Sequence, residues 1–400
     1  MRKLMIFLYL FLFALVALSQ QRVLQIWAMG EEAKKLNVMA EKFVQENPNV
    51  RVEIQAIPWS AAYDKLLTGI AGGQLPDLAQ MGTTWMAPFG AIGAFEELTP
   101  YLAKSFIKKE MFFDGSWQTV TMNGGVYGIP WYVDVRVMFY RTDILKEVGY
   151  ERAPQTWDEL YDVAKKLKAR GEGYYALSLL FTGVFGNEFM PFVWQAGGKI
   201  LDEKGNVRVT DPEFVQAIEF YARFFWEELA PTAGGNLFQD FAKGTVPIFF
   251  SGPWMVRMID EQTPEVKGKW SVALMPKKVK RTSFVGGCNW VIFKNSKNKD
   301  LAWKFIEFMT RPENQIEWYK LVSNLPAVVE AWNFPELAND PMMKVFRAQL
   351  EDAMSPPNVP QWEEIATAIS RRVEEVIFKK RTPQEAANML KRDIEKIVRK

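Results

Sequence analysis

The residue types in this chain limit the chemistry that it can perform. It contains no histidine, and Cys288 is its only cysteine. Ser–His and Cys–His nucleophile pairs, histidine general bases and Cys/His zinc sites are therefore excluded. Carboxylates and aromatic rings are abundant, since 14% of the residues are aromatic. Carboxylates accept strong hydrogen bonds from hydroxyl groups and indoles cover apolar faces, so these types favour an amphipathic ligand, although core packing also uses aromatic rings.

Five candidate ligand-binding residues lie at or just after the ends of the first three expected strands. Trp27 and Glu31 are at the carboxyl end of the first strand, Trp59 follows the second, and Thr83 and Thr84 follow the third. The carboxyl ends of parallel strands meet at one edge of a sheet, where ligands bind in open α/β folds. We therefore expect these residues at the rim of a binding site, with a purely structural role as the alternative for each.

The elements that would position these residues alternate between strand and helix. Short apolar runs alternate with segments in which apolar residues recur at helical spacing. In order, they are a strand at Val23–Ala28, a helix at Glu31–Asn47, a strand at Val50–Ile57, a helix from the cap Ser60 to Ala71, and a strand at Pro76–Met81. This order predicts a layered, mostly parallel α/β domain.

A second α/β unit is expected further along, in agreement with the two domains that the length favours. Thr156, with Glu159 three residues later, predicts a capped helix start. The expected strands are Val135–Tyr140, Tyr174–Leu179 and Val246–Phe250, and the expected helices are Asp143–Val148, Thr156–Ala169, Asp211–Glu228 and the chain from Gln361 onward.

The amino-terminal residues predict export. Arg2 and Lys3 precede the apolar run Leu4–Leu18, and Ala17 and Ser19 form a small-residue cleavage pattern. We expect residues 1–19 to be a signal peptide, leaving a periplasmic or secreted protein. No cysteine stands at the cut, so a lipoprotein is not expected. An uncleaved anchor is the alternative, but the run is shorter than the ~20 residues of a membrane span.

The charge balance of the mature chain argues against a nucleic-acid partner. Loss of Arg2 and Lys3 reduces the 49 basic residues to 47, which balance the 47 acidic residues. A nucleic-acid-binding domain normally carries a basic excess. The lone Cys288 has no partner for an internal disulfide, and we expect it to be packed and inert.

Five segments resemble one protein family, and they occur in the family's order. Tyr127–Leu160 reads YGIPWYVDVRVMFYRTDILKEVGYERAPQTWDEL and resembles the first lobe crossing of family 1 extracellular solute-binding proteins. These are the maltose-binding-protein-like sugar receptors of ABC importers. The other four segments are Asp77–Trp85, Pro191–Gly198, Lys243–Val256 and Phe284–Phe293.

The resemblance implies a two-lobed, periplasmic-binding-protein-like α/β fold with three hinge crossings. These would lie near Tyr132–Val133, Gly286–Gly287 and Ser323–Leu325. Lobe 1 would then comprise residues 20–132 and 287–323, and lobe 2 residues 133–286 and 324–400. The implied function is binding of a mono- or oligosaccharide between the lobes by a monomer, which delivers it to the transmembrane subunits of an ABC permease. No metal, cofactor or catalytic residue is implied.

Matching to the family's motifs adds candidate ligand-binding residues. Asp134 matches a ligand-gripping acid, with an ion pair to Arg136 or Arg141 as the alternative. Trp254 and Trp362 match cleft aromatics, with core packing as the alternative. Gly286 and Gly287 let the backbone approach closely at a crossing, and Asn289 just beyond them could reach a hydroxyl. Weaker candidates are Asn187 and Glu188. The chain departs from the maltose-binding protein after the third strand, at Gly82–Met86, so its sugar stays open.

Two other classes of protein could carry carboxylates and tryptophans outside the cytoplasm. A glycoside hydrolase would need two carboxyl groups ~5–10 Å apart across one cleft. Asp134 is the one acid that the motifs assign to the site, and Glu31 would come from the opposite lobe. A carbohydrate-adhesion module is disfavoured because the sequence shows no repeats. The sequence therefore favours a binding protein over an enzyme.

Overall fold

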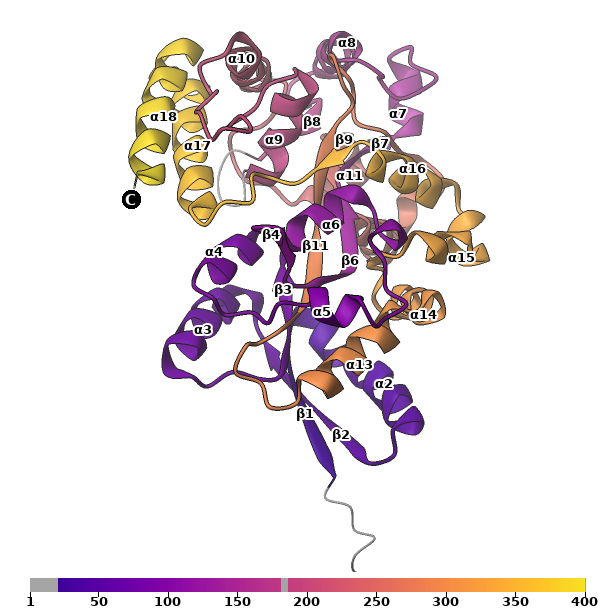
Figure 1. Ribbon diagram of the computed structural model, residues 1–400. Coiled ribbons are helices and arrows are strands. Elements are labelled where there is room, and N and C mark those ends of the chain that lie inside the picture. The colour runs from indigo at the N-terminus through magenta and orange to yellow at the C-terminus, as the bar shows by residue number, and fades with distance from the viewer. Residues whose placement is uncertain (1–20, 181–185, 400) are drawn as a thin grey trace, which may run out of the picture.

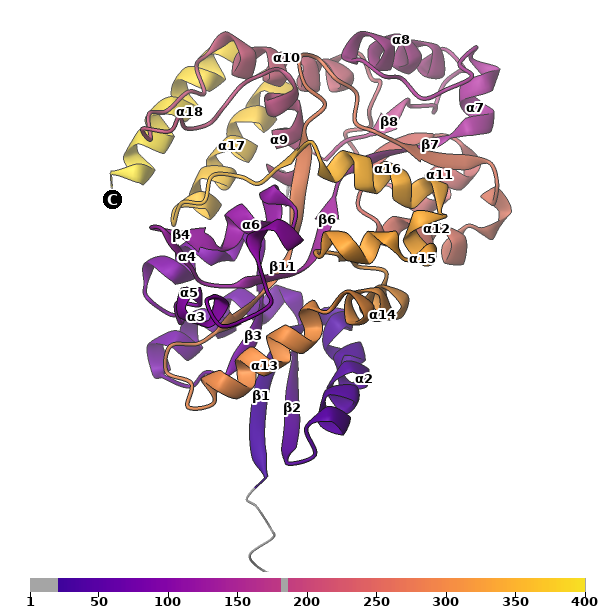
Figure 2. The ribbon, with the colours of Figure 1, turned by 45° about the vertical axis from the view of Figure 1, so that its right-hand side comes forward.

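The computed structural model describes residues 21–180 and 186–399. The expected signal peptide, residues 1–19, lies outside the described residues. Two lobes are visible, each with a sheet covered by helices, and strands β6 and β11 run between them (Figure 1). The turned view shows the same two lobes, with α17 and α18 on the edge of the upper one (Figure 2). The two-lobed α/β fold is as predicted.

The lower lobe is built on a mixed sheet. Its strand order is β12-β6-β11-β3-β1-β2, with β13 paired to the far end of β11. β1, β2 and β3 are parallel, as predicted, whereas β11 is antiparallel to both β3 and β6. The strands are β1 (Arg22–Met29), β2 (Val50–Ile57), β3 (Leu78–Gly82), β6 (Ile129–Val135), β11 (Ser283–Ile292), β12 (Leu325–Pro326) and β13 (Ala353–Met354).

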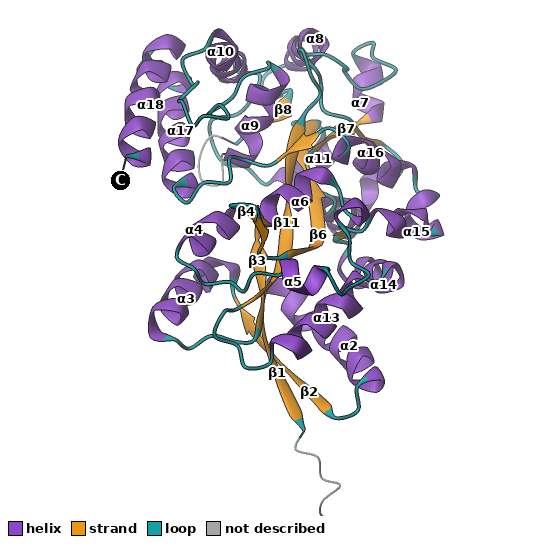
Figure 3. Ribbon diagram, viewed as in Figure 1, coloured by secondary structure: helices purple, strands orange, loops and turns teal. Residues whose placement is uncertain are grey.

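Helices lie on both faces of this sheet, as the colouring by secondary structure shows (Figure 3). A small hairpin of β4 (Thr121–Met122) and β5 (Gly125–Val126) lies at the edge of the lobe that faces the upper one. The helices are α2 (Gly30–Glu46), α3 (Trp59–Gly72), α4 (Met86–Ala91), α5 (Thr99–Leu102), α6 (Asp114–Val120), α13 (Lys299–Thr310) and α14 (Pro312–Val322).

The upper lobe has a smaller sheet, β10-β7-β9-β8, in which β7 is antiparallel to both neighbours. Its strands are β7 (Val137–Arg141), β8 (Leu177–Ser178), β9 (Ile248–Ser251) and β10 (Trp270–Ala273). Its helices are α7 (Thr142–Glu147), α8 (Trp157–Lys168), α9 (Gly186–Gln195), α10 (Pro212–Trp226), α11 (Leu237–Lys243), α12 (Trp254–Gln262), α15 (Pro335–Ala338), α16 (Pro341–Leu350), α17 (Trp362–Ile377) and α18 (Pro383–Val398).

Two hydrophobic cores meet at the small sheet. The side chains of β7 alternate, with Phe139 packed toward the core that extends into the lower lobe and Met138 toward the core of the upper lobe. This is the alternation expected of a strand buried on both faces. Consequently, packing on both faces of β7 fixes the strand that directly follows β6.

The three predicted hinge crossings are cross-strand neighbours. Val133 of β6 pairs with Gly287 of β11 on one side and with Leu325 of β12 on the other. A register shift between Cys288 and Asn289 interrupts the β6–β11 ladder beside this row. A β-bulge of this kind bends a strand locally. The lobe boundaries themselves stay a prediction.

Local sequence signals hold in some places and fail in others. Thr156 caps α8 by accepting the N–H of Glu159, and Gly73 ends α3 with a left-handed φ of 67°. Ser60 does not cap α3, because the helix begins one residue earlier, after Pro58. The expected strand Val135–Tyr140 is interrupted at Arg136, where the chain passes from β6 to β7. The chain after Gln361 is helical as expected, and it forms the two helices α17 and α18.

Candidate functional site

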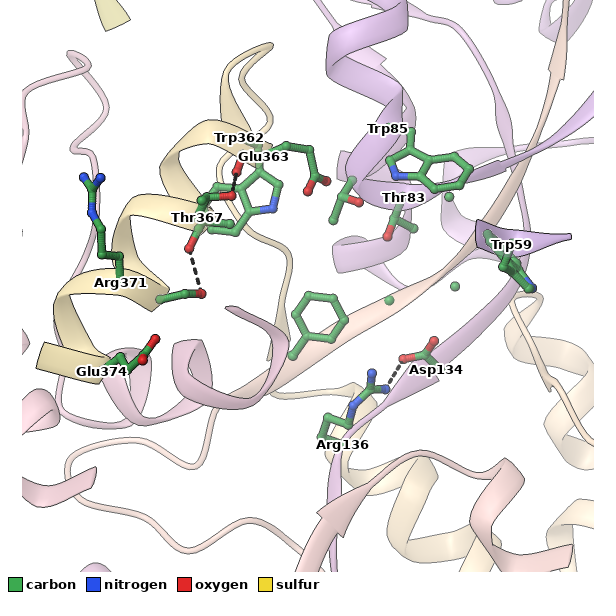
Figure 4. Close-up of a pocket in the computed structure, with 17 residues that line it drawn as sticks. Trp59, Thr83, Trp85, Asp134, Arg136, Trp362, Glu363, Thr367, Arg371 and Glu374 are labelled. Carbon is green, nitrogen blue, oxygen red and sulfur yellow. Dashed lines mark hydrogen bonds and ion pairs between the residues drawn. The ribbon is translucent and has the colours of Figure 1, made fainter. Parts of the chain in front are cut away.

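A cavity of about 650 Å³ lies between the two lobes. The lower lobe contributes the residues around α3 and β3, the upper lobe contributes α17, and the strands of the hinge lie between them (Figure 4). Its lining residues are Trp59, Gly82, Thr83, Thr84, Trp85, Asp134, Arg136, Phe284, Gly286, Gly287, Trp362, Glu363, Ala366, Thr367, Ser370, Arg371 and Glu374.

The lower wall combines indoles with hydroxyl groups. Trp59 begins α3, and Thr83, Thr84 and Trp85 form a 3₁₀ helix directly after β3. The rings of Trp59 and Trp85 lie 5.6 Å apart at 60°, and Tyr63 meets Trp85 edge-on from behind. Such packing holds the indoles in fixed orientations, so a ligand meets preformed apolar faces beside two hydroxyls.

Two glycines at the hinge bring the backbone close to the cavity. Gly287 has a φ of 119°, and a Cβ there would overlap the carbonyl oxygen of Tyr132 on the neighbouring strand. A Cβ on Gly286 would lie 2.8 Å from the Oδ1 of Asp134. Only glycine combines this φ with so close an approach. The two glycines therefore keep the Asp134 carboxylate accessible from the cavity.

Asp134 and Arg136 form the charged floor of the site. The guanidinium of Arg136 donates to Asp134 at 2.6 Å, and its Nε lies 3.6 Å from Glu188. The guanidinium also packs over the ring of Trp254, 4.8 Å from its centroid, and over Phe284 at 5.4 Å. Among the described residues, the buried Nε of Arg136 has no hydrogen-bond acceptor. It faces the carboxylate of Glu188.

The carboxyl of Glu188 is buried behind this pair. Burial raises the pKa of Glu188 above its ordinary value, and the nearby cation of Arg136 opposes that shift. The negative charge of Asp134 raises the same pKa further. Arg136 is thus shared between two carboxylates, an arrangement that fixes its position.

The upper wall is one face of α17. Trp362 begins the helix and is 3% exposed, whereas Glu363, Thr367, Arg371 and Glu374 follow along the cavity (Figure 4). Burial raises the pKa of Glu363, and a hydrogen bond with Thr84 of the opposite lobe opposes that shift. The opposite face of α17 carries Ile365, Ile369 and other apolar residues of the core. Their packing therefore turns the polar face of the helix toward the cavity.

Six of the predicted site residues line this cavity, and four of those whose side chains the structure describes do not. Trp59, Thr83, Thr84, Asp134, Gly287 and Trp362 line it. Asp134 is also ion-paired with Arg136, as the alternative held, while Arg141 instead binds Asp143.

The structure corrects the expected position of four residues. Trp27 packs against the core and lies under Lys65, and Glu31 is 69% exposed and ion-paired with Lys34. Trp254 packs on Arg136 instead of lining the cavity. Asn289 is 1% exposed, and its side-chain amide donates to Thr119 at 3.1 Å. Asn187 belongs to α9, but its side chain lies outside the described part of the structure.

Sequence reasoning missed Trp85, Arg136, Phe284 and the polar residues of α17. Trp85 is next to Thr83 and Thr84, so its place in the same rim loop could have indicated it. Arg136 was considered only as a partner of Asp134. In the sequence, the polar face of α17 looks like any solvent-exposed helix face. Periodicity identifies the buried face, but it does not tell whether the polar face meets solvent or a cavity.

Other kinds of site were searched among the described residues. In residues 21–180 and 186–399, no group of three or more Cys, Asp and Glu side chains is arranged to hold a metal ion. Within the same ranges, no helix combines the length and apolar character that crossing a bilayer requires.

Comparison with known proteins identifies the family. Residues 29–316 match the model of the bacterial extracellular solute-binding protein family. The sugar-binding protein MalE of Xanthomonas citri superposes with a TM-score of 0.89 at 33% identity, covering 94% of this chain and 97% of that one. The maltotriose-binding protein of Pyrococcus abyssi is 26% identical over 92% of this chain and 78% of its own length. A maltooligosaccharide ABC transporter solute-binding lipoprotein of Streptococcus pneumoniae is 24% identical over 87% and 82%.

The chain therefore belongs to the bacterial extracellular solute-binding protein family. Proteins of this family and the relatives above are solute-binding proteins, not enzymes. They act in the periplasm or outside the cell.

Proposed function

We propose that this protein binds a saccharide in the cavity between its lobes and presents it to the transmembrane subunits of an ABC permease. The observation that carries the proposal is the lining itself, which combines indoles, hydroxyls and a carboxylate–arginine pair contributed by both lobes. A saccharide offers C–H faces that indoles cover and hydroxyls that a carboxylate binds strongly. The cavity of about 650 Å³ is within the range of ligand pockets.

In this proposal, each wall has a separate role. Trp59, Trp85 and Trp362 cover sugar faces, and Asp134 accepts hydroxyl protons while Arg136 holds its carboxylate in place. Closure of the lobes about the three crossings lets both walls contact the ligand at once. Hinge closure is how periplasmic binding proteins hold their ligands, and the closed shape is what a permease would recognise.

We also propose the state in which the protein works. The signal peptide would be cleaved after Ser19, releasing an unlipidated monomer, since no cysteine stands at that cut. The Streptococcus pneumoniae relative is named as a lipoprotein, so the intact mass of the exported protein decides the point. A mass that includes a diacylglycerol, or residues 1–18, contradicts this proposal.

A thermal-shift screen tests the binding function. The relatives' names suggest maltotriose, maltose, lactose, mannotriose and tagatose as probes. A ligand that binds only the folded state at 100 times its Kd adds about 2.7 kcal/mol to stability, which raises the melting temperature measurably. The matched control is Asp134→Asn, which removes the central carboxylate and should reduce the shift. A flat response to saccharides of every class contradicts the proposed function.

A further inference from the structure

We propose that Glu363 determines specificity by excluding anionic saccharides, so that the site accepts neutral or amino sugars and rejects uronates. This inference rests on the proposed function and concerns the same cavity. It begins with the charges that line the cavity and with the partners that each of them has.

Both arginines of the cavity are already held by carboxylates of the protein. Arg136 binds Asp134 at 2.6 Å and lies 3.6 Å from Glu188. Arg371 of α17 is ion-paired with Asp393 of α18 at 3.0 Å. An incoming carboxylate would therefore have to compete with an existing partner at either cation, and it would meet the negative charge of that partner.

Two further carboxylates on α17 face the same space without a cation. Glu363 and Glu374 both line the cavity, and among the described residues neither has an ion-pair partner within 4.0 Å. Glu363 instead interacts with the hydroxyl of Thr84, and burial raises its pKa. Its charge also raises the pKa of Tyr63 in the opposite lobe, although burial of that phenol is the larger cause. The field of Glu363 thus spans the cleft.

The sum of these charges decides which ligands fit. Two arginines face five carboxylates, if Glu188 and Asp393 are included with the lining residues. A like charge brought next to a partly desolvated carboxylate is strongly unfavourable, and such repulsion is a common source of specificity. A hydroxyl can donate to Glu363, and an ammonium group can do so with added attraction. The carboxylate of a uronate can do neither without protonation.

The test compares pairs of ligands that differ only at C6. Maltotriose, mannotriose and lactose are titrated calorimetrically, each beside its counterpart in which the C6 hydroxymethyl groups are oxidised to carboxylates. For the neutral sugar that binds, we expect at least about 100-fold tighter binding than for its uronate form, as like-charge juxtaposition costs several kcal/mol. The difference should shrink in high salt, because screening weakens charge repulsion.

Substitutions on α17 test whether Glu363 causes the weaker binding of the uronate forms. Glu363→Gln should reduce the ratio of the affinity for the neutral sugar to that for its uronate form by about tenfold or more. This reduction is expected whatever the variant does to the affinity for the neutral sugar. Glu374→Gln should reduce the ratio less, and it replaces the first variant if that one does not fold. The control Glu364→Gln lies on the same helix but does not line the cavity, so the ratio should stay as in the wild type.

The outcomes separate this inference from the proposed function. Comparable binding of both forms by the wild type, or a preference for the uronate, overturns the charge exclusion but leaves saccharide binding intact. A ratio that neither Glu363→Gln nor Glu374→Gln changes overturns the assignment to α17. Failure of all the sugars, neutral and charged, overturns the proposed function and this inference with it.

Discussion

Asp134 and Asp143 are the same residue type in nearly the same local setting. Each accepts from an arginine two residues away at 2.6 Å, but only Asp134 lines the cavity. Asp134→Asn keeps the shape and loses the charge, so saccharide affinity should fall by roughly 1.5–3 kcal/mol, the range for hydrogen bonds to charged groups. Calorimetric titration measures this loss. Asp143→Asn is the matched control, and an equal loss there would point to destabilised arginines instead of lost ligand contacts.

Glu363 offers a second prediction at this scale, on stability. Burial raises its pKa above the ordinary 4.5, so the folded state holds its proton to higher pH than the unfolded state. Stability is therefore lost as pH rises from about 4.5 through the folded pKa, and the carboxylate is unfavourable at pH 7. Glu363→Gln should raise the melting temperature at pH 7 by a few degrees, and the gain should vanish near pH 4. A gain that is equal at both pH values contradicts this account.

The sequence placed the residues after the second and third strands correctly at the cavity, but not those at the end of the first strand. Trp59, Thr83 and Thr84 could be placed on the rim because the strand pattern fixes where loops converge. Site prediction failed where a neighbouring element covers the residue. Asn289 is 1% exposed, and its amide donates to Thr119 of α6 instead of reaching the cavity. Periodicity indicates which face of a strand a side chain takes, but not which helix packs on that face.

Among the secondary-structure elements, the helices were predicted best from the sequence. α2, α8 and α10 agree with their expected ranges within two residues, because helical spacing and caps mark them. The sheet order was less accessible, since β11 inserts between β3 and β6 from far along the sequence. Periodicity indicates that a strand exists but not which strand it pairs with.

Strand β11 carries a backbone requirement that gives a third prediction. An alanine at position 287 would have to adopt a φ of 119°, and its Cβ would overlap the carbonyl oxygen of Tyr132. At Gly149 φ is 86°, but nothing lies within 4 Å. Gly149→Ala should therefore cost about 1–2 kcal/mol of unfolding free energy from φ alone. Gly287→Ala should cost at least about 3 kcal/mol, because the backbone must also shift. Urea unfolding of both variants measures the difference. Equal losses of unfolding free energy would show that strands β6 and β11 can move apart at little cost.

The same strand holds Cys288, whose thiol is buried between β3 and β6. It accepts hydrogen bonds from Gln80 at 3.4 Å and from the hydroxyl of Tyr132 at 3.1 Å. Burial raises its pKa to about 12, and the hydrogen bonds only partly oppose this. A thiolate is the reactive form, so we expect native protein to resist alkylation at pH 8 for hours and to react once unfolded in guanidinium. Rapid alkylation of the native protein would show that the hinge opens far enough to expose the thiol.

For the whole molecule, the hinge row and the cavity together predict a change of shape. The row Gly287–Val133–Leu325 is where the three predicted crossings lie side by side, and the cavity walls belong to opposite lobes. A saccharide that contacts Trp59 and Trp362 together favours whichever conformation brings those walls closest. Small-angle scattering should therefore show a smaller radius of gyration at saturating ligand than without ligand.

A control separates this closure from simple ligand uptake. Trp362→Ala removes the indole of the upper wall and leaves the lower wall intact, so a ligand should still contact Trp59 but gain less from closure. The radius of gyration should then fall less at equal saturation, and affinity should drop by roughly 2 kcal/mol or more, as for other buried aromatic anchors. Since Trp362 is 3% exposed and also packs in the upper core, its melting curve must be recorded beside the scattering. A wild-type radius that stays constant at saturation would mean that the ligand enters a cleft that is already closed.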